Sequence, residues 1–309
     1  MEAKTPRVGI AQIAPVYLNK EASLAKALDC IQTASARGVE LLVFGETWFP
    51  GYPVWLDVCP TAGLWNHEPT KRVFAQLRRN SLVVVGPETR ALAAAARDHK
   101  LAIVIGINER VERGPGQGTL YNSLLTFTPD GVLANHHRKL VPTFTERIVW
   151  GQGDGSGLAS ACVGETRVGG LICWEHWMPL ARTAMHQAGE HIHVALWPTA
   201  NEMAQLASRH YAFEGRCFVI AAGLMMKTAD LPSGLPHDVK GEWVEHGGSA
   251  IIAPDASYLV EPIYDREELI VANLDLSMID RESMALDVTG HYARPDIFRF
   301  SHGPITKVD

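Results

Sequence analysis

Cys173 is the residue whose type and position most clearly suit chemistry. The apolar residues 168–172, which include two glycines, lead directly to Cys173, and Pro179 follows just before a helix-like stretch. This pattern predicts a strand, a tight turn and the start of a helix. A thiol at that point would lie at the rim of a sheet, where the partial positive charge of a helix N-terminus favours the reactive thiolate.

A cysteine nucleophile needs a base, because its ordinary pKa of about 8.5 leaves only a small fraction of thiolate at neutral pH. Glu46 follows the apolar residues 41–44, and burial there would raise its pKa and suit it to accept a proton. Lys139 follows another strand-like run, and its cation could stabilise negative charge that develops on a substrate nitrogen or oxygen. None of the 13 histidines shows a local pattern that ties it to Cys173.

Each of these residues also has a structural explanation. Cys173 could be a buried small hydrophobe, which is the commoner role of a single cysteine. Glu46 could cap a loop, and Lys139 could be a solvated surface charge. The combination of the three favours the catalytic interpretation. His191 and His193 share one face of a predicted strand, but no third ligand lies nearby in the sequence, so no metal site is expected.

In their order along the chain, Glu46, Lys139 and Cys173 resemble the Glu-Lys-Cys set of the nitrilase (carbon–nitrogen hydrolase) superfamily. The segment Cys-Trp-Glu-His at 173–176 resembles the true nitrilase branch more than the amidase or carbamoylase branches. The resemblance extends from about residue 7 to residue 298. The other matching segments are GETWFPGYP at 45–53, HRKLVPTFTER at 137–147, GSAIIAPD at 248–255 and GHYARPD at 290–296.

The resemblance implies a mechanism. Glu46 would take the proton of the Cys173 thiol, whose sulfur would attack a nitrile carbon to form a thioimidate. Lys139 and the backbone N–H of Trp174 would stabilise the substrate nitrogen. Glu146, which matches a further family glutamate but could also belong to an exposed ion-paired segment, would hold Lys139 in place. Two waters would then yield a carboxylic acid and ammonia through a thioester. The resemblance implies no metal ion or organic cofactor.

Aromatic residues near these candidates could form a substrate wall. The residues expected to bind substrate are Trp174, Tyr52, Trp55, His137 and Trp197. An aromatic wall would favour an aryl or arylalkyl nitrile, although an aliphatic nitrile also fits. Three other functions stay open. The protein could be an amidase, or a hydratase-like enzyme whose main product is the amide, as in the cyanide hydratases of the same branch. It could also be a scaffold protein that has lost catalysis.

The elements that must position these residues alternate early in the chain between strands and helices. Helices are predicted at residues 20–37, capped by Asn19, and at 89–100, 179–190, 202–216 and 277–286. Strands are predicted at 7–14, 41–44, 101–109, 121–128, 167–172, 191–197 and 217–224, with several short strands over 249–274. Residues 47–70 are predicted to form a long irregular loop.

This alternation predicts an α/β layered domain with a mixed sheet. The resemblance implies more specifically a four-layer α-β-β-α sandwich with two mixed sheets. Because no linker, repeat or low-complexity segment divides the chain, we expect residues 1–309 to form a single domain, with a core at about 7–280 and a tail at 281–309.

Composition excludes several classes of partner. The net charge is −6 and no long basic run occurs, so we expect neither nucleic acid nor a membrane as a partner. The longest apolar run is too short to cross a bilayer, and the first residues lack the apolar region of a signal peptide, which together predict a cytoplasmic protein. The five cysteines are irregularly spaced and indicate no disulfide framework. The expected partners are a small-molecule nitrile and, by the resemblance, further copies of the chain in a homodimer or higher homo-oligomer.

Overall fold

The computed structural model of the chain describes residues 5–303. Residues 1–4 and 304–309 lie outside the described part. They include the first residues of the expected domain and the end of the expected tail. In residues 5–303, no helix combines the length and the apolar character that a membrane crossing requires.

The first of two sheets contains six strands in the order β13-β1-β2-β3-β4-β5. Strands β1, β2 and β3 run parallel, whereas β13, β4 and β5 pair antiparallel with their neighbours, so the sheet is mixed. The strands are β1 (Arg7–Gln12), β2 (Leu41–Phe44), β3 (Ala102–Arg110), β4 (Leu120–Phe127), β5 (Leu133–Arg138) and β13 (Glu268–Asn273).

The second sheet is also mixed and follows the order β10-β11-β9-β8-β7-β6, with β12 paired to β11. Strands β7, β8 and β9 are parallel, and the remaining pairs are antiparallel. The strands are β6 (Ala161–Val163), β7 (Thr166–Ile172), β8 (Ile192–Trp197), β9 (Phe218–Gly223), β10 (Met225–Lys227), β11 (Trp243–Ile252) and β12 (Tyr258–Tyr264).

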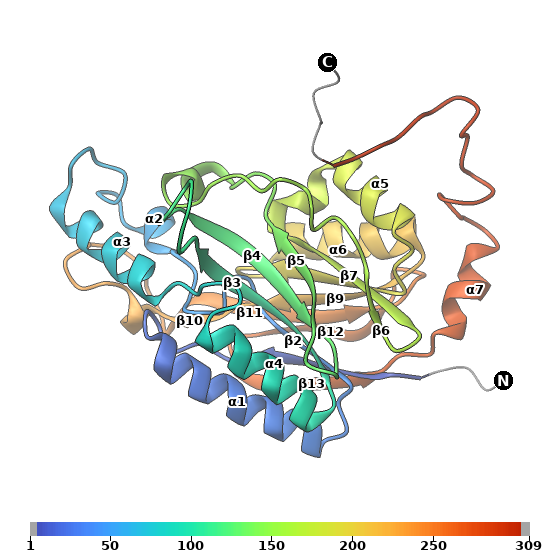
Figure 1. The fold of residues 1–309 in the computed structure, drawn as a ribbon, viewed down its shortest axis with the longest axis horizontal. Helices are drawn as coiled ribbons and strands as arrows, with labels where there is room; N and C mark the ends of the chain where they lie inside the picture. The colour runs from blue at the N-terminus through green and yellow to red at the C-terminus, as the bar shows by residue number, and fades with distance from the viewer. Residues whose placement is uncertain (1–4, 304–309) are drawn as a thin grey trace.

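Helices cover the outer face of each sheet (Figure 1). The helices α1 (Lys20–Ala36) and α4 (Pro87–His99) lie on the first sheet, and α5 (Pro179–Gln187) and α6 (Glu202–Gly215) lie on the second. The two sheets pack against each other, as the contacts of β1 with β9 and of β4 with β7 show. The predicted four-layer α-β-β-α sandwich is therefore confirmed.

The short strand β2 shows why its sequence is uniformly apolar. Successive side chains of a strand point to opposite faces of the sheet. Leu41 and Val43 belong to the hydrophobic core between the sheets, whereas Leu42 and Phe44 belong to the core beneath α1 and α4. Both faces are buried, so alternation with polar residues would place polar groups in one of the two cores.

Most predicted helices agree with the structure within a few residues, and the Asn19 side chain caps α1 by accepting a hydrogen bond from the Ala22 N–H at 3.0 Å. The predicted loop at 47–70 is wrong in part. It contains the short helix α2 (Trp55–Val58), and α3 (Glu68–Asn80) begins before the loop was expected to end. The last helix, α7 (Ser277–Ser283), ends earlier than predicted.

Three connections at strand ends carry the candidate catalytic residues. Glu46 lies two residues after β2, Lys139 directly after β5, and Cys173 directly after β7. Since β7 belongs to the second sheet and the other two strands to the first, the packing of the sheets brings the three residues together.

Gly106 on β3 allows the connection that carries Glu46 to lie directly on the strand. A Cβ atom at Gly106 would lie 2.4 Å from the Gly45 carbonyl oxygen, 2.5 Å from the Thr47 nitrogen and 2.9 Å from the Glu46 Cα. These are backbone atoms, which cannot move aside as a flexible side chain could. Only glycine therefore fits at this position without displacing Glu46.

We expect Gly106→Ala to lower the free energy of unfolding by about 1–3 kcal/mol, as overpacking of a core does. Urea denaturation measures the loss. The matched control is Gly63→Ala, whose added Cβ would meet only the Ile148 Cδ1 atom at 3.9 Å and should change stability by less than about 0.5 kcal/mol. Equal losses in the two variants would contradict the close approach at Gly106.

Candidate active site

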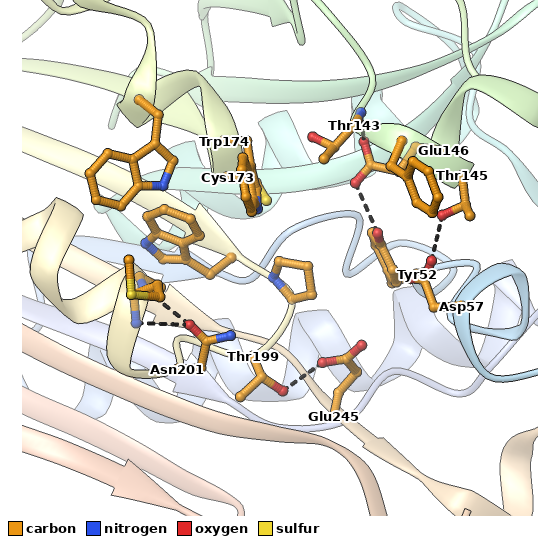
Figure 2. Close-up of a pocket in the computed structure, with 16 residues that line it drawn as sticks. Tyr52, Asp57, Thr143, Thr145, Glu146, Cys173, Trp174, Thr199, Asn201 and Glu245 are labelled. Carbon is orange, nitrogen blue, oxygen red and sulfur yellow. Dashed lines mark hydrogen bonds between the residues drawn. The ribbon is translucent and has the colours of Figure 1, made fainter. Parts of the chain in front are cut away.

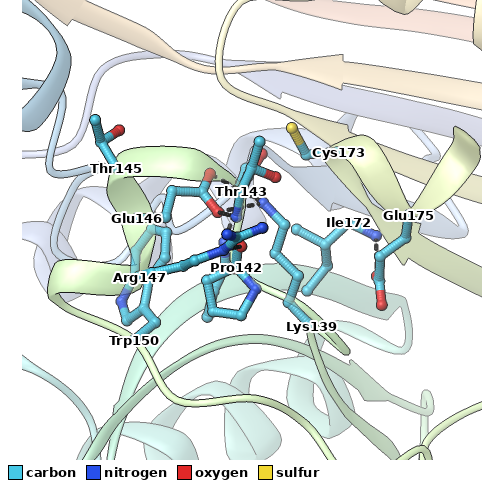
Figure 3. A network of polar contacts seen from close by, with 12 residues as sticks. Lys139, Pro142, Thr143, Thr145, Glu146, Arg147, Trp150, Ile172, Cys173 and Glu175 are labelled. Atoms are coloured by element: carbon cyan, nitrogen blue, oxygen red, sulfur yellow. Dashed lines mark hydrogen bonds and ion pairs between the residues drawn. The ribbon is translucent and has the colours of Figure 1, made fainter.

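Four ionisable side chains meet in one buried cluster. The Cys173 Sγ atom and one carboxylate oxygen each from Glu46 and Glu146 all lie within 4.8 Å of one another. The Lys139 Nζ atom donates to Glu46 Oε1 at 3.2 Å and to the Glu146 oxygens at 3.0 and 2.8 Å. Figure 3 shows the Lys139 side chain reaching toward Glu146, with Cys173 beside it. All four side chains are almost completely inaccessible to solvent.

The backbone at Cys173 adopts an uncommon conformation. Its φ angle is +54°, in the left-handed region that costs a non-glycine residue about 1–3 kcal/mol. Here β7 ends and the 3₁₀-helix Cys173–Trp177 begins, so the expected tight turn is present, but a 3₁₀ turn precedes α5. The sharp change of direction places the thiol on the cavity described below.

A buried carboxylate, Glu175, fixes the segment of Lys139 relative to that of Cys173. Its oxygens accept hydrogen bonds from the Leu140 N–H at 2.8 Å and the Ile172 N–H at 2.7 Å, and His137 Nε2 lies 2.9 Å from Oε2. Burial alone would raise the pKa of Glu175, but His137 and the two backbone donors outweigh it and lower the pKa. The carboxylate is therefore charged and links the two sheets at this point.

A second buried chain of hydrogen bonds leads from the Cys173 carbonyl into α6. His176 Nδ1 lies 2.7 Å from that carbonyl oxygen, His176 Nε2 lies 2.9 Å from His193 Nε2, and His193 Nδ1 lies 2.8 Å from Glu190 Oε2. The Tyr211 hydroxyl donates to the other Glu190 oxygen. Burial lowers the pKa of His176 to about 3 and raises that of Glu190 to about 8.

These partners fix the direction of the chain. A carbonyl oxygen only accepts, so His176 donates from Nδ1 and, being neutral, accepts at Nε2 from His193. Neutral His193 must then accept at Nδ1 from the protonated carboxyl of Glu190. The chain holds the carbonyl of the strained Cys173 residue, and no local feature of the sequence indicated it.

The electrostatics of the cluster favour a neutral thiol beside a titratable base. Burial raises the pKa of Glu46 to about 7, although Lys139 lowers it and Glu146 raises it further. Burial, together with Glu46, raises the pKa of Cys173 well above its ordinary value, against the opposing effect of Lys139. Burial alone would lower the pKa of Lys139, but the negative charges that Cys173, Glu46 and Glu146 carry when ionised raise it above its usual range.

The two oxygens of Glu46 have different surroundings. Oε1 accepts from Asn122 Nδ2 at 2.7 Å and from Lys139, whereas Oε2 is buried and has no hydrogen-bond partner within residues 5–303. An unpaired buried carboxylate oxygen is costly. Oε2 is free to accept a proton, and one oxygen of the same carboxylate lies within 4.8 Å of the Cys173 Sγ atom. Glu46 is therefore suitable as a general base. Asn122, which fixes the orientation of the carboxylate, was not found from the sequence.

Cys173 opens onto a cavity of about 410 Å³, drawn in Figure 2. Three of the residues expected to bind substrate, Tyr52, Trp174 and Trp197, line this cavity, and Tyr52 also donates to Glu146 Oε1 at 2.8 Å. The lining residues that the sequence did not indicate are Asp57, Thr143, Phe144, Thr145, Trp177, Pro198, Thr199, Asn201, Met203, Ala204 and Glu245. Phe144 and Trp177 are close in sequence to Glu146 and Trp174, which is the one signal that could have found them.

Trp55 and His137, which were also expected to bind substrate, are not among the residues that line this cavity. Trp55 lies in α2 and is buried in the core beneath the first sheet, since its large apolar ring is removed from water there. His137 lies on β5 and is occupied by its hydrogen bond to Glu175. The sequence placed both beside catalytic candidates but could not show toward which side their side chains point.

Loss of the Glu175 charge should destabilise the protein. We expect Glu175→Gln to lower the free energy of unfolding by about 2–4 kcal/mol, because an amide cannot accept on both of its terminal atoms from His137 and the two backbone N–H groups. Urea denaturation at neutral pH measures this effect. Glu165→Gln changes an exposed carboxylate in the turn before β7. It is the control and should stay within about 0.5 kcal/mol of the parent. A similar loss in both variants would contradict the role of Glu175.

Comparison with known proteins agrees with this geometry. The family model described as carbon–nitrogen hydrolase matches residues 7–281. A protein named nitrilase 2 from an unknown prokaryotic organism is 39% identical over 95% of this chain and 91% of its own length. An aliphatic nitrilase from Sinorhizobium fredii is 39% identical over 95% and 94%. A crystal structure of a carbon–nitrogen hydrolase from Helicobacter pylori G27 superposes with a TM-score of 0.73 at 18% identity, covering 95% of this chain and 97% of the other. The chain therefore belongs to the carbon–nitrogen hydrolase family and, within it, to the nitrilase branch.

Proposed function

We propose that this protein is a nitrilase, which converts an organic nitrile and two waters into a carboxylic acid and ammonia. The observation that carries the proposal is the buried cluster on the cavity: the Cys173 thiol, the unpaired Oε2 of Glu46 and the ammonium of Lys139. Relatives named nitrilase, similar over nearly the whole chain, support the same activity. The thiol supplies the nucleophile, the carboxylate the base, and the ammonium a fixed positive charge.

The first step forms a thioimidate. The Cys173 thiol gives its proton to Glu46, and Sγ attacks the nitrile carbon, so that a carbon–sulfur bond forms as one π bond of the nitrile breaks. The electron pair of that π bond goes to the nitrogen, which takes the proton from Glu46, so that Glu46 is again ionised. Lys139 and the backbone N–H of Trp174 stabilise the charge that develops there. Because these donors are already held in place, little reorganisation is needed.

Two waters complete the reaction. Glu46 activates the first water, which attacks the thioimidate carbon; the carbon–nitrogen bond breaks, ammonia leaves and a thioester remains. The second water attacks the thioester, the carbon–sulfur bond breaks, and the acid is released with the thiol restored. Glu146 keeps Lys139 in position through both steps, and Tyr52 orients Glu146.

The cavity supports a preference for aryl or arylalkyl nitriles. Aromatic side chains on several sides of the cavity offer flat apolar surfaces for a ring. They are Tyr52, Phe144, Trp174, Trp177 and Trp197. The relative named aliphatic nitrilase favours an aliphatic substrate as the second candidate. Comparing kcat/KM for benzonitrile, phenylacetonitrile and pentanenitrile decides between the two classes.

We expect Cys173→Ala to abolish ammonia release from every nitrile of a panel, with a loss of roughly 10⁴-fold or more, because the covalent step is removed. Cys162→Ala, which changes an exposed cysteine, should retain full activity. Ammonia from amides but from no nitrile would instead indicate an amidase, and amide as the main product would indicate a hydratase. Undiminished activity of Cys173→Ala would contradict catalysis by this thiol.

The pKa of Glu46 predicts a pH dependence. A general base must be ionised, and burial places the pKa of Glu46 at about 7. We therefore expect kcat/KM to fall about tenfold per pH unit as the pH decreases below about 7, and to level off above it. Initial rates of ammonia release from pH 5 to 9 measure the profile. A kcat/KM that stays constant down to pH 5 would rule out a base with a raised pKa.

A further inference from the structure

Glu245 occupies the wall of the cavity across from Cys173, although it has no part in the steps above (Figure 2). It lies on β11, and the residue is only 6% exposed. A carboxyl group buried to this degree is unfavourable unless it has partners. Because Glu245 lies on the cavity, a ligand in the cavity could be one of these partners.

Thr199 holds Glu245 through its side chain and its backbone, and no other residue in the described part of the chain forms a hydrogen bond with the Glu245 carboxyl group. The Thr199 hydroxyl accepts from the His246 N–H at 2.9 Å and donates to Glu245 Oε2 at 2.6 Å. Within residues 5–303, no side chain donates to Oε1. If Glu245 served only to tether the connection after β8 to β11, its bond to Thr199 would be enough. The other oxygen remains available to a ligand.

The surrounding charges favour a cation over an anion. Asp57, Glu146 and Glu245 line the cavity, whose described lining includes no lysine, arginine or histidine. Lys139 does not line the cavity and is already paired with two carboxylates. Burial raises the pKa of Glu245 to about 8, reinforced by the charges of Glu46 and Asp57 and opposed by its hydrogen bonds with Thr199. Without a ligand the carboxyl group is therefore mostly protonated at neutral pH, and a bound ammonium group favours its ionised form.

Aromatic rings complete the environment of a cation. The indole groups of Trp174, Trp177 and Trp197 and the phenol ring of Tyr52 line the same cavity. The face of an aromatic ring attracts a cation, and more strongly where water is excluded. A carboxyl oxygen without a side-chain donor, together with several rings, is a combination suited to an ammonium group.

We infer that Glu245 forms a subsite for a protonated amino group of the substrate, so that the preferred nitriles carry an ammonium group a few bonds from the nitrile carbon. This inference rests on the proposed nitrilase function and narrows its substrate class. The ammonium would bind Glu245 Oε1 and contact the aromatic wall, while the nitrile carbon lies at Cys173. A carboxylate at the same place on the substrate would be repelled.

Matched substrates test the subsite. We compare 3-aminopropanenitrile, 4-aminobutanenitrile and 5-aminopentanenitrile with butanenitrile, pentanenitrile and hexanenitrile, in which a methyl group replaces the ammonium. We expect the best-placed aminonitrile to exceed its methyl counterpart in kcat/KM by about tenfold or more, mainly through KM, which corresponds to about 1.4 kcal/mol. If no aminonitrile exceeds its counterpart, the inference is overturned.

Two variants assign the preference to Glu245. Glu245→Gln keeps the size and an acceptor for Thr199 but cannot ionise beside a bound ammonium group, so the ratio of kcat/KM for aminonitrile to that for its methyl counterpart should fall to about one. Glu242→Gln makes the same charge change at an exposed position and should leave the ratio unchanged. A ratio that survives Glu245→Gln, or falls equally in both variants, would overturn the inference.

Failure of the subsite can be distinguished from failure of the nitrilase proposal. If the wild-type protein releases ammonia from no nitrile, the proposed function fails, and binding then tests the subsite directly. The three aminonitriles are titrated calorimetrically into the Cys173→Ala variant and into the double variant Cys173→Ala/Glu245→Gln. We expect the double variant to bind them about tenfold more weakly. Equal affinities in the two proteins, or no binding to either, would overturn the subsite.

Discussion

The structure of the site depends on one buried cation. The Lys139 ammonium lies between the carboxylates of Glu46 and Glu146 beside the Cys173 thiol, in a region without solvent access. A buried charge is tolerated only when it is paired and hydrogen-bonded. Every connection that reaches the cluster must therefore be placed accurately. Gly106, Asn122, Tyr52 and Glu175 each hold a part of it. Gly106 and Asn122 lie on β3 and β4, Tyr52 precedes α2, and Glu175 lies in the 3₁₀-helix that follows β7.

The same charge balance determines where the reactive proton lies. Lys139 and Glu146 form a close ion pair whose charges cancel. The protonation states that remain to be decided are those of Glu46 and Cys173. Two further negative charges beside one ammonium would repel each other, and burial disfavours both. The protein therefore holds a neutral thiol next to a carboxyl group whose pKa is near 7. Proton transfer from Cys173 to Glu46 can then accompany attack on the substrate, without prior formation of a stable thiolate.

Features that are local in sequence were predictable. Apolar runs before Glu46 and Cys173 and a strand-like run before Lys139 placed these residues at strand ends. The family resemblance supplied the layers that bring them together. Helix α3 was missed because most of its side chains are polar and only Val73 and Leu77 are buried. The hydrogen-bonded chain through His193 and the cavity position of Glu245 depend on residues far apart in sequence, and a single sequence carries no signal for such contacts. Trp55 and His137 are close in sequence to catalytic candidates, but a single sequence does not show in which direction their side chains point.

Our main proposal for the site is that Glu46 is the base for Cys173. Its most direct test compares the wild-type protein with Glu46→Gln in the rate at which iodoacetamide alkylates Cys173. Mass spectrometry of the peptide that contains Cys173 measures this rate. We expect the wild-type rate to rise with pH through a midpoint near 7, the pKa of Glu46. In Glu46→Gln that midpoint should disappear and the rate at pH 7–8 should fall, because no base accepts the thiol proton. Identical rates and identical pH profiles in the two proteins would contradict the account.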